Sequence, residues 1–189
     1  MTARRLYIVR HGQTASSARK AYSGRSDVPL TETGREQARA AGAQLAEAGI
    51  DAIFSSPLSR ARDTAQAIAG ATGAALHVDE RLTEVDYRAF EGMDRAEARE
   101  HFGDAFQAWR DDPFGSPVEG MEPLADALDR ARAATADVLA AAQRPVIVGH
   151  QGILRIVLIA LGELEQHEYF SKRLYEAQPL AIDDPEVAH

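Results

Sequence analysis

Short apolar runs alternate with amphipathic stretches along this chain. The apolar runs have the length of buried strands and lie at residues 6–9, 52–54, 75–78 and 146–149. Between them, apolar residues recur at helical spacing, in the stretches 38–48, 58–68, 124–142 and 153–161. A last strand is expected near residues 177–182. Strands that alternate with helices predict an α/β fold in which a mainly parallel central sheet carries helices on both faces.

Capping patterns indicate where several helices begin and end. The capping-box pattern at residues 33–36 predicts the start of one helix. Ser56 is expected to cap the next helix, which Gly70 would end. Asp94 would begin a later helix, and Gly103 would end it. The two long irregular stretches are expected to be loops, at residues 12–30 and 111–123.

Composition narrows the class of protein. The 189 residues, 45% hydrophobic and 26% charged, fit a single soluble domain spanning residues 1–189. A net charge of −8 argues against nucleic acid or an anionic membrane surface as the main partner. The chain has no cysteine, which excludes disulfides, thiolate catalysis and cysteine zinc sites. No apolar run reaches membrane-spanning length, so we expect a cytoplasmic protein with no membrane partner.

Two of the expected strands end in a histidine followed within two residues by a glycine. The first strand runs into Arg10, His11 and Gly12, and the strand at 146–149 runs into His150. Open α/β sheets bind ligands at the carboxyl ends of their strands. Two strand-end histidines so far apart in the sequence can meet only if their strands are neighbours. The repeated pattern therefore predicts that these two strands lie side by side.

The residues around these histidines suit a phosphoryl group. Arg10 and Arg60 can each offer a forked guanidinium to phosphate oxygens. His150, if protonated, adds a third donor, and the N–H of Gln151 with the helix start after it adds an anion site. In such a pocket His11 would attack phosphorus through a ring nitrogen and form a covalent phosphohistidine.

A phosphohistidine mechanism also needs a fixed imidazole tautomer and a proton donor. A backbone carbonyl, such as that of Gly12, is expected to hold the other ring nitrogen of His11. A carboxylic acid would protonate the leaving alkoxide and later activate water. Glu84, just after the third strand, is the candidate, with Asp86 as its rival by spacing and Glu91 as a weaker one.

Five ordered segments resemble the histidine phosphatase superfamily, and within it the phosphoglycerate mutase-like branch. The segments are residues 10–12, 24–31, 55–61, 82–84 with 91–92, and 149–152. The resemblance covers residues 4–162 and implies a three-layer α/β/α fold. It implies that His11 is the phosphoacceptor and Glu84 the proton donor. The implied phosphate pocket consists of Arg10, Arg60 and His150. Within the family the chain resembles short α-ribazole phosphatases and broad-specificity phosphatases.

The departures from the family pattern lie around the expected phosphate pocket. Ser17 stands where the family often has an Asn facing the phosphate, and Arg88 stands where a Gly is common. Gln151 follows the second histidine, where Gly or Ala is usual. We expect these three residues to bind substrate together with Ser23 and Gly24. Arg88 would bind a second anionic group of the substrate.

The sequence therefore predicts a phosphomonoesterase that acts on a small phosphorylated metabolite without a metal or other cofactor. A homodimer is a candidate assembly. Three alternatives stay open: phosphoglycerate mutase-type transfer in the same pocket, a non-catalytic module that binds phosphorylated ligands, and a metal hydrolase. Mutases of the family carry a longer, more cationic segment after the catalytic Glu, which favours hydrolysis here. The His-Glu-x-x-His spacing of a zinc hydrolase is absent.

Overall fold

The computed structural model describes residues 4–188, and five strands in that part of the chain form one sheet of order β3-β2-β4-β1-β5. The strands are β1 (Arg5–Arg10), β2 (Ala52–Ser55), β3 (Ala75–Val78), β4 (Pro145–Gly149) and β5 (Leu180–Asp183). Only β5 runs antiparallel to its neighbour, so the sheet is mainly parallel, as predicted. β5 begins later than expected because Ala177 has a positive φ of 50°, which an extended strand does not allow.

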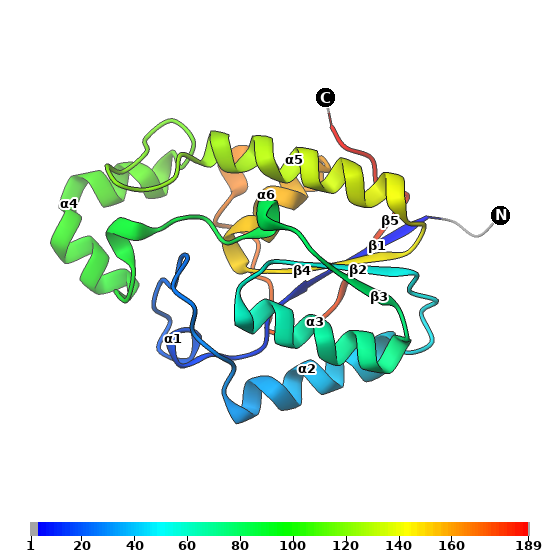
Figure 1. The fold of residues 1–189 in the computed structure, drawn as a ribbon. Helices are drawn as coiled ribbons and strands as arrows, with labels where there is room; N and C mark the ends of the chain where they lie inside the picture. The colour runs from blue at the N-terminus through cyan, green and yellow to red at the C-terminus, as the bar shows by residue number, and fades with distance from the viewer. Residues whose placement is uncertain (1–3, 189) are drawn as a thin grey trace.

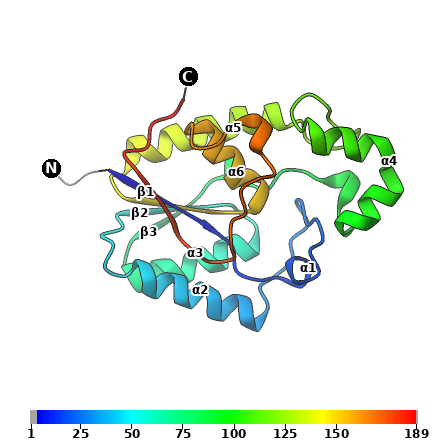
Figure 2. The same ribbon diagram turned by 180° about the vertical axis from the view of Figure 1, so that it is seen from behind.

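Helices cover both faces of the sheet. They are α1 (Ala15–Ala18), α2 (Glu32–Leu45), α3 (Ser59–Thr72), α4 (Arg95–Asp111), α5 (Leu124–Ala141) and α6 (Gln151–Ala160). Three single-turn helices lie at Glu80–Leu82, Arg88–Phe90 and Gln166–Glu168. In Figure 1, α2 and α3 lie against one face, α5 and α6 lie against the other, and Figure 2 shows the same layers from behind. The predicted three-layer α/β/α fold is confirmed.

The central strands explain why the apolar runs are continuous. β4 is buried along its whole length. Val146 and Val148 pack with α2 and α3, whereas Ile147 packs with α5 and α6. β1 alternates in the same way, since Ile8 and Val9 belong to opposite cores. A strand with a core on each side needs apolar residues at successive positions, which is what the sequence shows.

Two helices start at other residues than the sequence predicted. The N-cap of α2 is Thr31, whose hydroxyl accepts the Gly34 N–H at 3.0 Å, so the pattern at 33–36 lies inside the helix. The helix after β2 starts at Ser59, and Ser56 does not cap it. The Ser59 N–H instead donates to the carboxylate of Asp27 at 2.8 Å. A side chain more than thirty residues away thus replaces the local cap.

Of the two glycines that were expected to end helices, Gly70 does not and Gly103 does. α3 continues through Gly70 and ends at Gly73, which has the left-handed φ of 74° that closes helices. α4 starts after Asp94, and its helical backbone breaks at Gly103, which has a φ of 51° and a ψ of −122°. The first helical segment therefore ends where the sequence predicted, and a second segment continues across the kink to Asp111.

A close contact between two backbone segments sets the position of the loop after β1. A side chain added at Gly12 would overlap with the carbonyl oxygen of Gly34 in α2, and one added at Gly34 would overlap with the carbonyl oxygen of Gln13. The absence of Cβ atoms therefore lets the first turn of α2 press against the end of β1. This contact fixes the backbone that carries His11.

We expect Gly34→Ala to lower the free energy of unfolding by about 1–3 kcal/mol, because the new methyl group forces backbone segments apart. The matched control is Gly70→Ala in α3, where an added Cβ meets no atom within 4 Å. That change should raise the free energy of unfolding by about 0.5–1 kcal/mol through helix propensity. Urea unfolding of both variants measures the difference, and equal stabilities would contradict the close-contact account.

Candidate active site

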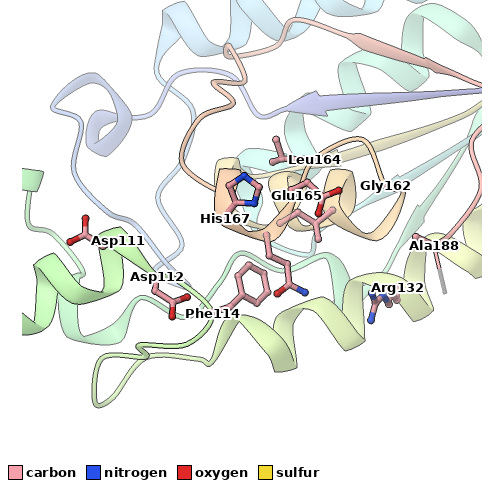
Figure 3. A pocket seen from close by; sticks show the side chains of 11 residues that line it. Asp111, Asp112, Phe114, Arg132, Gly162, Leu164, Glu165, His167 and Ala188 are labelled. Atoms are coloured by element: carbon pink, nitrogen blue, oxygen red, sulfur yellow. The ribbon is translucent and has the colours of Figure 1, made fainter.

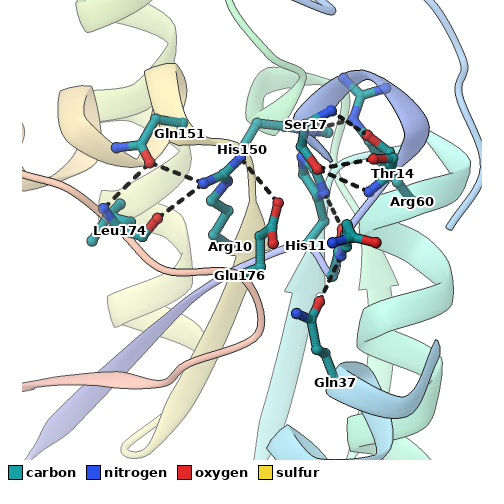
Figure 4. Close-up of polar contacts among 12 residues, drawn as sticks. Arg10, His11, Thr14, Ser17, Gln37, Arg60, His150, Gln151, Leu174 and Glu176 are labelled. Carbon is teal, nitrogen blue, oxygen red and sulfur yellow. Dashed lines mark hydrogen bonds and ion pairs between the residues drawn. The ribbon is translucent and has the colours of Figure 1, made fainter. Parts of the chain in front are cut away.

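The register between β1 and β4 brings the two strand-end histidines together. Arg10 pairs with Gly149, and the N–H of His11 donates to the Gly149 carbonyl at 2.9 Å. The next residue after Gly149 is His150, and the centroids of the two imidazole rings lie 5.1 Å apart. Figure 4 shows the residues around this pair, among them Arg10 from β1, Arg60 from α3 and Gln151 from the start of α6. The predicted meeting of the two histidines is confirmed.

The tautomer of His11 is fixed by its own neighbour. Nδ1 lies 2.7 Å from the carbonyl oxygen of Gly12, which can only accept, so Nδ1 carries the proton. Burial, together with the charges of Arg10 and Arg60, lowers the pKa of His11 well below its ordinary value. The imidazole is therefore neutral, and Nε2 keeps a free lone pair. The hydroxyl of Thr64 accepts the Gly12 N–H at 3.1 Å and holds this peptide in place.

Arg60 is buried beside the second histidine. Its Nε donates to Nδ1 of His150 at 3.1 Å, and its terminal nitrogens donate to the carbonyls of Ser26 and Gly24 at 2.7 and 2.8 Å. Nε2 of His150 lies 2.8 Å from the hydroxyl of Ser56. Because Nδ1 accepts, Nε2 carries the proton, and burial with the Arg60 charge lowers the pKa of His150 well below its ordinary value. His150 therefore donates as a neutral imidazole and not as the imidazolium considered from the sequence.

Arg10 lies on the other side of the histidine pair. Its guanidinium donates to the Leu174 carbonyl at 3.1 Å and to the Gln151 side chain at 3.4 Å, and it lies 3.6 Å from Glu176 (Figure 4). Burial lowers the pKa of Arg10, while the charges of Glu176 and Glu84 raise it. Its Nε is buried and has no hydrogen-bond partner among residues 4–188. A buried donor without a partner is uncommon and needs an acceptor that these residues do not supply.

Glu84 occupies the N-terminus of α6. One carboxylate oxygen accepts the N–H groups of Ile153 and Val85 at 2.8 and 2.9 Å, and the other accepts that of Gly152 at 3.0 Å. This helix start was expected to bind the phosphate. That assignment is wrong for Gly152 and Ile153, because the carboxylate of Glu84 already takes their N–H groups.

A family profile described as "Histidine phosphatase superfamily (branch 1)" matches residues 6–182. The chain belongs to the histidine phosphatase superfamily. It is 32% identical over 92% of its length to a probable 2-carboxy-D-arabinitol-1-phosphatase of Arabidopsis thaliana and 36% identical over 85% to a glucosyl-3-phosphoglycerate phosphatase of Mycolicibacterium vanbaalenii. The structure of a mycobacterial glucosyl-3-phosphoglycerate phosphatase with VO3 matches with a TM-score of 0.86 and 30% identity over 98% of both chains.

The chain covers different shares of these relatives. It spans 36% of the length of the Arabidopsis relative and 75% of the Mycolicibacterium relative. The family profile shows the family and the structural match shows the fold. The activity and the substrate of this chain are matters for proposal.

The other carboxylates considered from the sequence bind elsewhere. Asp86 accepts the Arg88 N–H at 3.0 Å and pairs with the Arg88 guanidinium at 3.1 Å. The Arg88 side chain is 78% exposed. Glu91 accepts the backbone N–H and the hydroxyl of Ser26 at 3.0 and 2.7 Å. Glu84 is thus the one of the three whose carboxylate lies at the start of α6, beside the histidines.

The residues expected in the outer pocket form hydrogen bonds with other residues of the protein. The Ser17 hydroxyl forms a capping box with Thr14 at the start of α1, and the Gly24 carbonyl accepts from Arg60. The carbonyl of half-buried Ser23 accepts a backbone N–H at 3.0 Å. The Gln151 side chain accepts from Arg10 and thereby positions that guanidinium. Their proposed contact with substrate stays a prediction.

Two residues that hold the site, Thr64 and Ser56, were not predicted from the sequence to do so. Thr64 lies four residues after Arg60 and donates to the Arg60 carbonyl at 2.7 Å, while it also accepts from Gly12. That spacing on a helix places Thr64 on the same face as Arg60, so it was a usable signal. Ser56 was read as a helix cap, whereas its hydroxyl is the partner of His150.

A separate cavity of about 470 Å³ lies between the end of α4, α5 and the segment after α6 (Figure 3). Its lining includes Asp112, Phe114, Arg132, Glu165 and His167, and none of the expected site residues lines it. Within the described part of the chain, no group of three or more His, Asp or Glu side chains is arranged to hold a metal ion. No helix in residues 4–188 has the length and apolar character needed to cross a membrane.

Because His11 and His150 are buried and neutral, we expect the free energy of unfolding to fall in acid. The pKa of both lies well below about 6.5 in the folded state, whereas an unfolded histidine binds a proton near pH 6.5. Stability is therefore fully present above about pH 6.5, and each histidine removes about 1.4 kcal/mol per pH unit as the pH falls below it.

Urea unfolding at several pH values between 7 and 5 measures this slope. His11→Gln should make the slope shallower by about 1.4 kcal/mol per pH unit. The control is His101→Gln, at an exposed position, which should keep the wild-type slope. An unchanged slope in His11→Gln would show that His11 titrates in the folded protein.

Proposed function

We propose that this chain is a phosphomonoesterase that hydrolyses small phosphorylated metabolites through a covalent phosphohistidine on His11. One observation carries the proposal: Nε2 of His11 holds a free lone pair, and the imidazole is buried within reach of the charges of Arg10 and Arg60. A neutral imidazole between two cations is a nucleophile placed where a phosphoryl group would bind.

The two arginines would bind the phosphoryl oxygens. A guanidinium has five N–H donors, and three hydrogen bonds to Ser26, Gly24 and His150 account for three of those of Arg60. The remaining donors, with the unpartnered Nε of Arg10, suit the three oxygens of a phosphoryl group. The Nε2–H of His150, which donates to Ser56 in this structure, would be a further donor to a phosphoryl oxygen.

The reaction proceeds in two displacements. The Nε2 lone pair of His11 attacks phosphorus, the bond from phosphorus to the ester oxygen breaks, and the leaving oxygen takes a proton from Glu84. The resulting Glu84 carboxylate then removes a proton from water, which attacks phosphorus. The bond between phosphorus and Nε2 breaks, and inorganic phosphate leaves. Both His11 and Glu84 return to their starting protonation states.

The hydrogen bonds of Glu84 leave room for that proton. A carboxyl group has about four lone-pair positions. One oxygen accepts two backbone N–H groups and the other accepts one, so the second oxygen keeps a position for a proton. The backbone of α6 holds the carboxyl group in one orientation. The N–H groups of α6 do not hold the Asp86 carboxylate, which pairs with Arg88 instead.

The relatives support the substrate class. Those described above are named for phosphatases of 2-carboxy-D-arabinitol 1-phosphate and glucosyl-3-phosphoglycerate, both small phosphorylated compounds. Phosphoglycerate mutase-type transfer is the alternative that uses the same groups, and it differs only in the acceptor of the phosphoryl group. A cytoplasmic location and a homodimer stay predictions, which cell fractionation and light scattering would test.

We expect His11→Ala to lower turnover of phosphate monoesters by at least about a thousandfold, because it removes the nucleophile. The readout is inorganic phosphate released from a panel of phosphate monoesters. Rapid quenching of the wild-type reaction should trap a phosphoprotein that is stable in base and labile in acid. Circular dichroism controls for folding, and residual activity within about tenfold of wild type would refute the covalent mechanism.

Glu84→Gln should separate substrates by the pKa of their leaving group. Hydrolysis of alkyl phosphates should fall by about 10²–10⁴-fold, because their alkoxides need a proton. Hydrolysis of p-nitrophenyl phosphate should fall less, since nitrophenolate leaves without one. Asp86→Asn is the matched control and should leave both substrates nearly unchanged. The opposite outcome, with Asp86→Asn selective and Glu84→Gln not, would assign the proton donor to Asp86.

A further inference from the structure

The segment that carries Glu84 has little regular structure of its own. Residues 83–87 lie between the single-turn helices Glu80–Leu82 and Arg88–Phe90, and they belong to no helix or strand. The N–H groups at the start of α6 hold the carboxylate end of Glu84. The peptide groups on either side of Glu84 need other partners, because no regular element supplies them.

Arg130, in α5, supplies partners on the N-terminal side of Glu84. One terminal nitrogen of its guanidinium donates to the carbonyls of Thr83 and Arg81, at 2.7 and 2.6 Å. The Thr83 carbonyl belongs to the peptide that joins Thr83 to Glu84. Arg130 therefore binds the main chain of the proposed proton donor itself.

Glu122, just before α5, holds the C-terminal side of the same segment. Its carboxylate accepts the Asp86 N–H at 3.0 Å, and its own N–H donates to the Asp86 carbonyl at 3.0 Å. The same carboxylate forms a bidentate pair with Arg130 at 2.7 and 3.0 Å, and the Arg25 guanidinium lies 3.5 Å from it. A bidentate pair fixes the direction of both side chains as well as their distance.

The Arg130–Glu122 pair is suited to hold the chain and not to bind a phosphate. Four hydrogen bonds account for four of the five N–H donors of Arg130. The two side chains are mostly buried, with exposed fractions of 17% for Arg130 and 12% for Glu122. Glu84 is thus held at both ends, by α6 at its carboxyl group and by this pair at its backbone. A misplacement of about 1 Å in a reacting group can lower a rate by about a hundredfold.

We propose that Arg130 and Glu122 are positioning residues for the proton transfer from Glu84. This inference rests on the proposed phosphatase function, in which Glu84 protonates the leaving oxygen. Among residues 4–188, the hydrogen bonds of the two side chains go to each other and to the backbone of residues 81–86. Loss of the pair should therefore impair the step that needs an acid and spare the binding of phosphate.

Two substrates that differ in their need for an acid test the inference. The measured parameter is kcat/KM, which reports the first displacement and not the hydrolysis of the phosphohistidine. Arg130→Met should lower kcat/KM about tenfold or more for glycerol 3-phosphate, but at most about threefold for p-nitrophenyl phosphate. Arg130→Lys restores the charge without the fork and should recover part of the loss. Competitive inhibition by inorganic phosphate should stay within about twofold of wild type.

A second variant and a control complete the design. Glu122→Gln keeps the size of the side chain and should show the same selectivity, so it serves as the test if circular dichroism shows that Arg130→Met does not fold. The control is Asp137→Asn, which removes an exposed ion pair of 2.7 Å between α5 and the Arg81 side chain. That pair does not contact the backbone of residues 83–86, so both substrates should react as with wild type.

The outcomes separate this inference from the proposed function. In a Glu84→Gln background, Arg130→Met should not change the ratio of the two kcat/KM values further. An equal fall for both substrates, no fall for either, or a matching loss of phosphate inhibition would overturn the positioning role. If Glu84→Gln is selective while Arg130→Met and Glu122→Gln are not, the inference alone fails. If Glu84→Gln itself shows no selectivity, the proposed role of Glu84 fails, and the inference fails with it.

Discussion

The parallel register between β1 and β4 is the constraint on which the site depends. It pairs Arg10 with Gly149, so that the next residues on the two strands are His11 and His150. Successive residues of a strand point to opposite faces, so a slip of one strand by one position would turn its histidine away from the histidine of the other strand. The continuous apolar run of β4, buried on both faces, makes such a slip costly. The core of the sheet therefore determines the geometry of the catalytic pair.

The charges of the site are arranged so that they remain available to a ligand. Arg60 is buried, yet its donors bind backbone carbonyls and an imidazole and no carboxylate. Carbonyl dipoles orient a guanidinium without neutralising it. Burial, with the charges of Arg10 and Arg60, lowers the pKa of His11 and keeps the imidazole neutral. A nucleophile and two cations that can bind an anion therefore coexist in one buried space. The carboxyl group of Glu84 lies at the start of α6, where two backbone N–H groups bind it.

The sequence predicted the features that depend on local residue patterns. It did not predict the features that depend on contacts between residues far apart in the sequence. Apolar runs gave four of the strands, and two strand-end histidines gave the neighbouring pair. The start of α3 was wrong because Asp27, far away in the sequence, supplies the cap that Ser56 was expected to supply. The helix start expected to bind phosphate holds Glu84, a contact between residues nearly seventy positions apart.

The position of phosphorus on the imidazole tests the central claim most directly. The hydrogen bond from Nδ1 of His11 to the Gly12 carbonyl leaves only Nε2 to act as the nucleophile. Nitrogen-15 and phosphorus-31 NMR of the quenched, histidine-labelled phosphoenzyme identifies the nitrogen that is bonded to phosphorus. The account predicts phosphorus on Nε2 of His11, with the proton still on Nδ1. Phosphorus on Nδ1, or on His150, would contradict it.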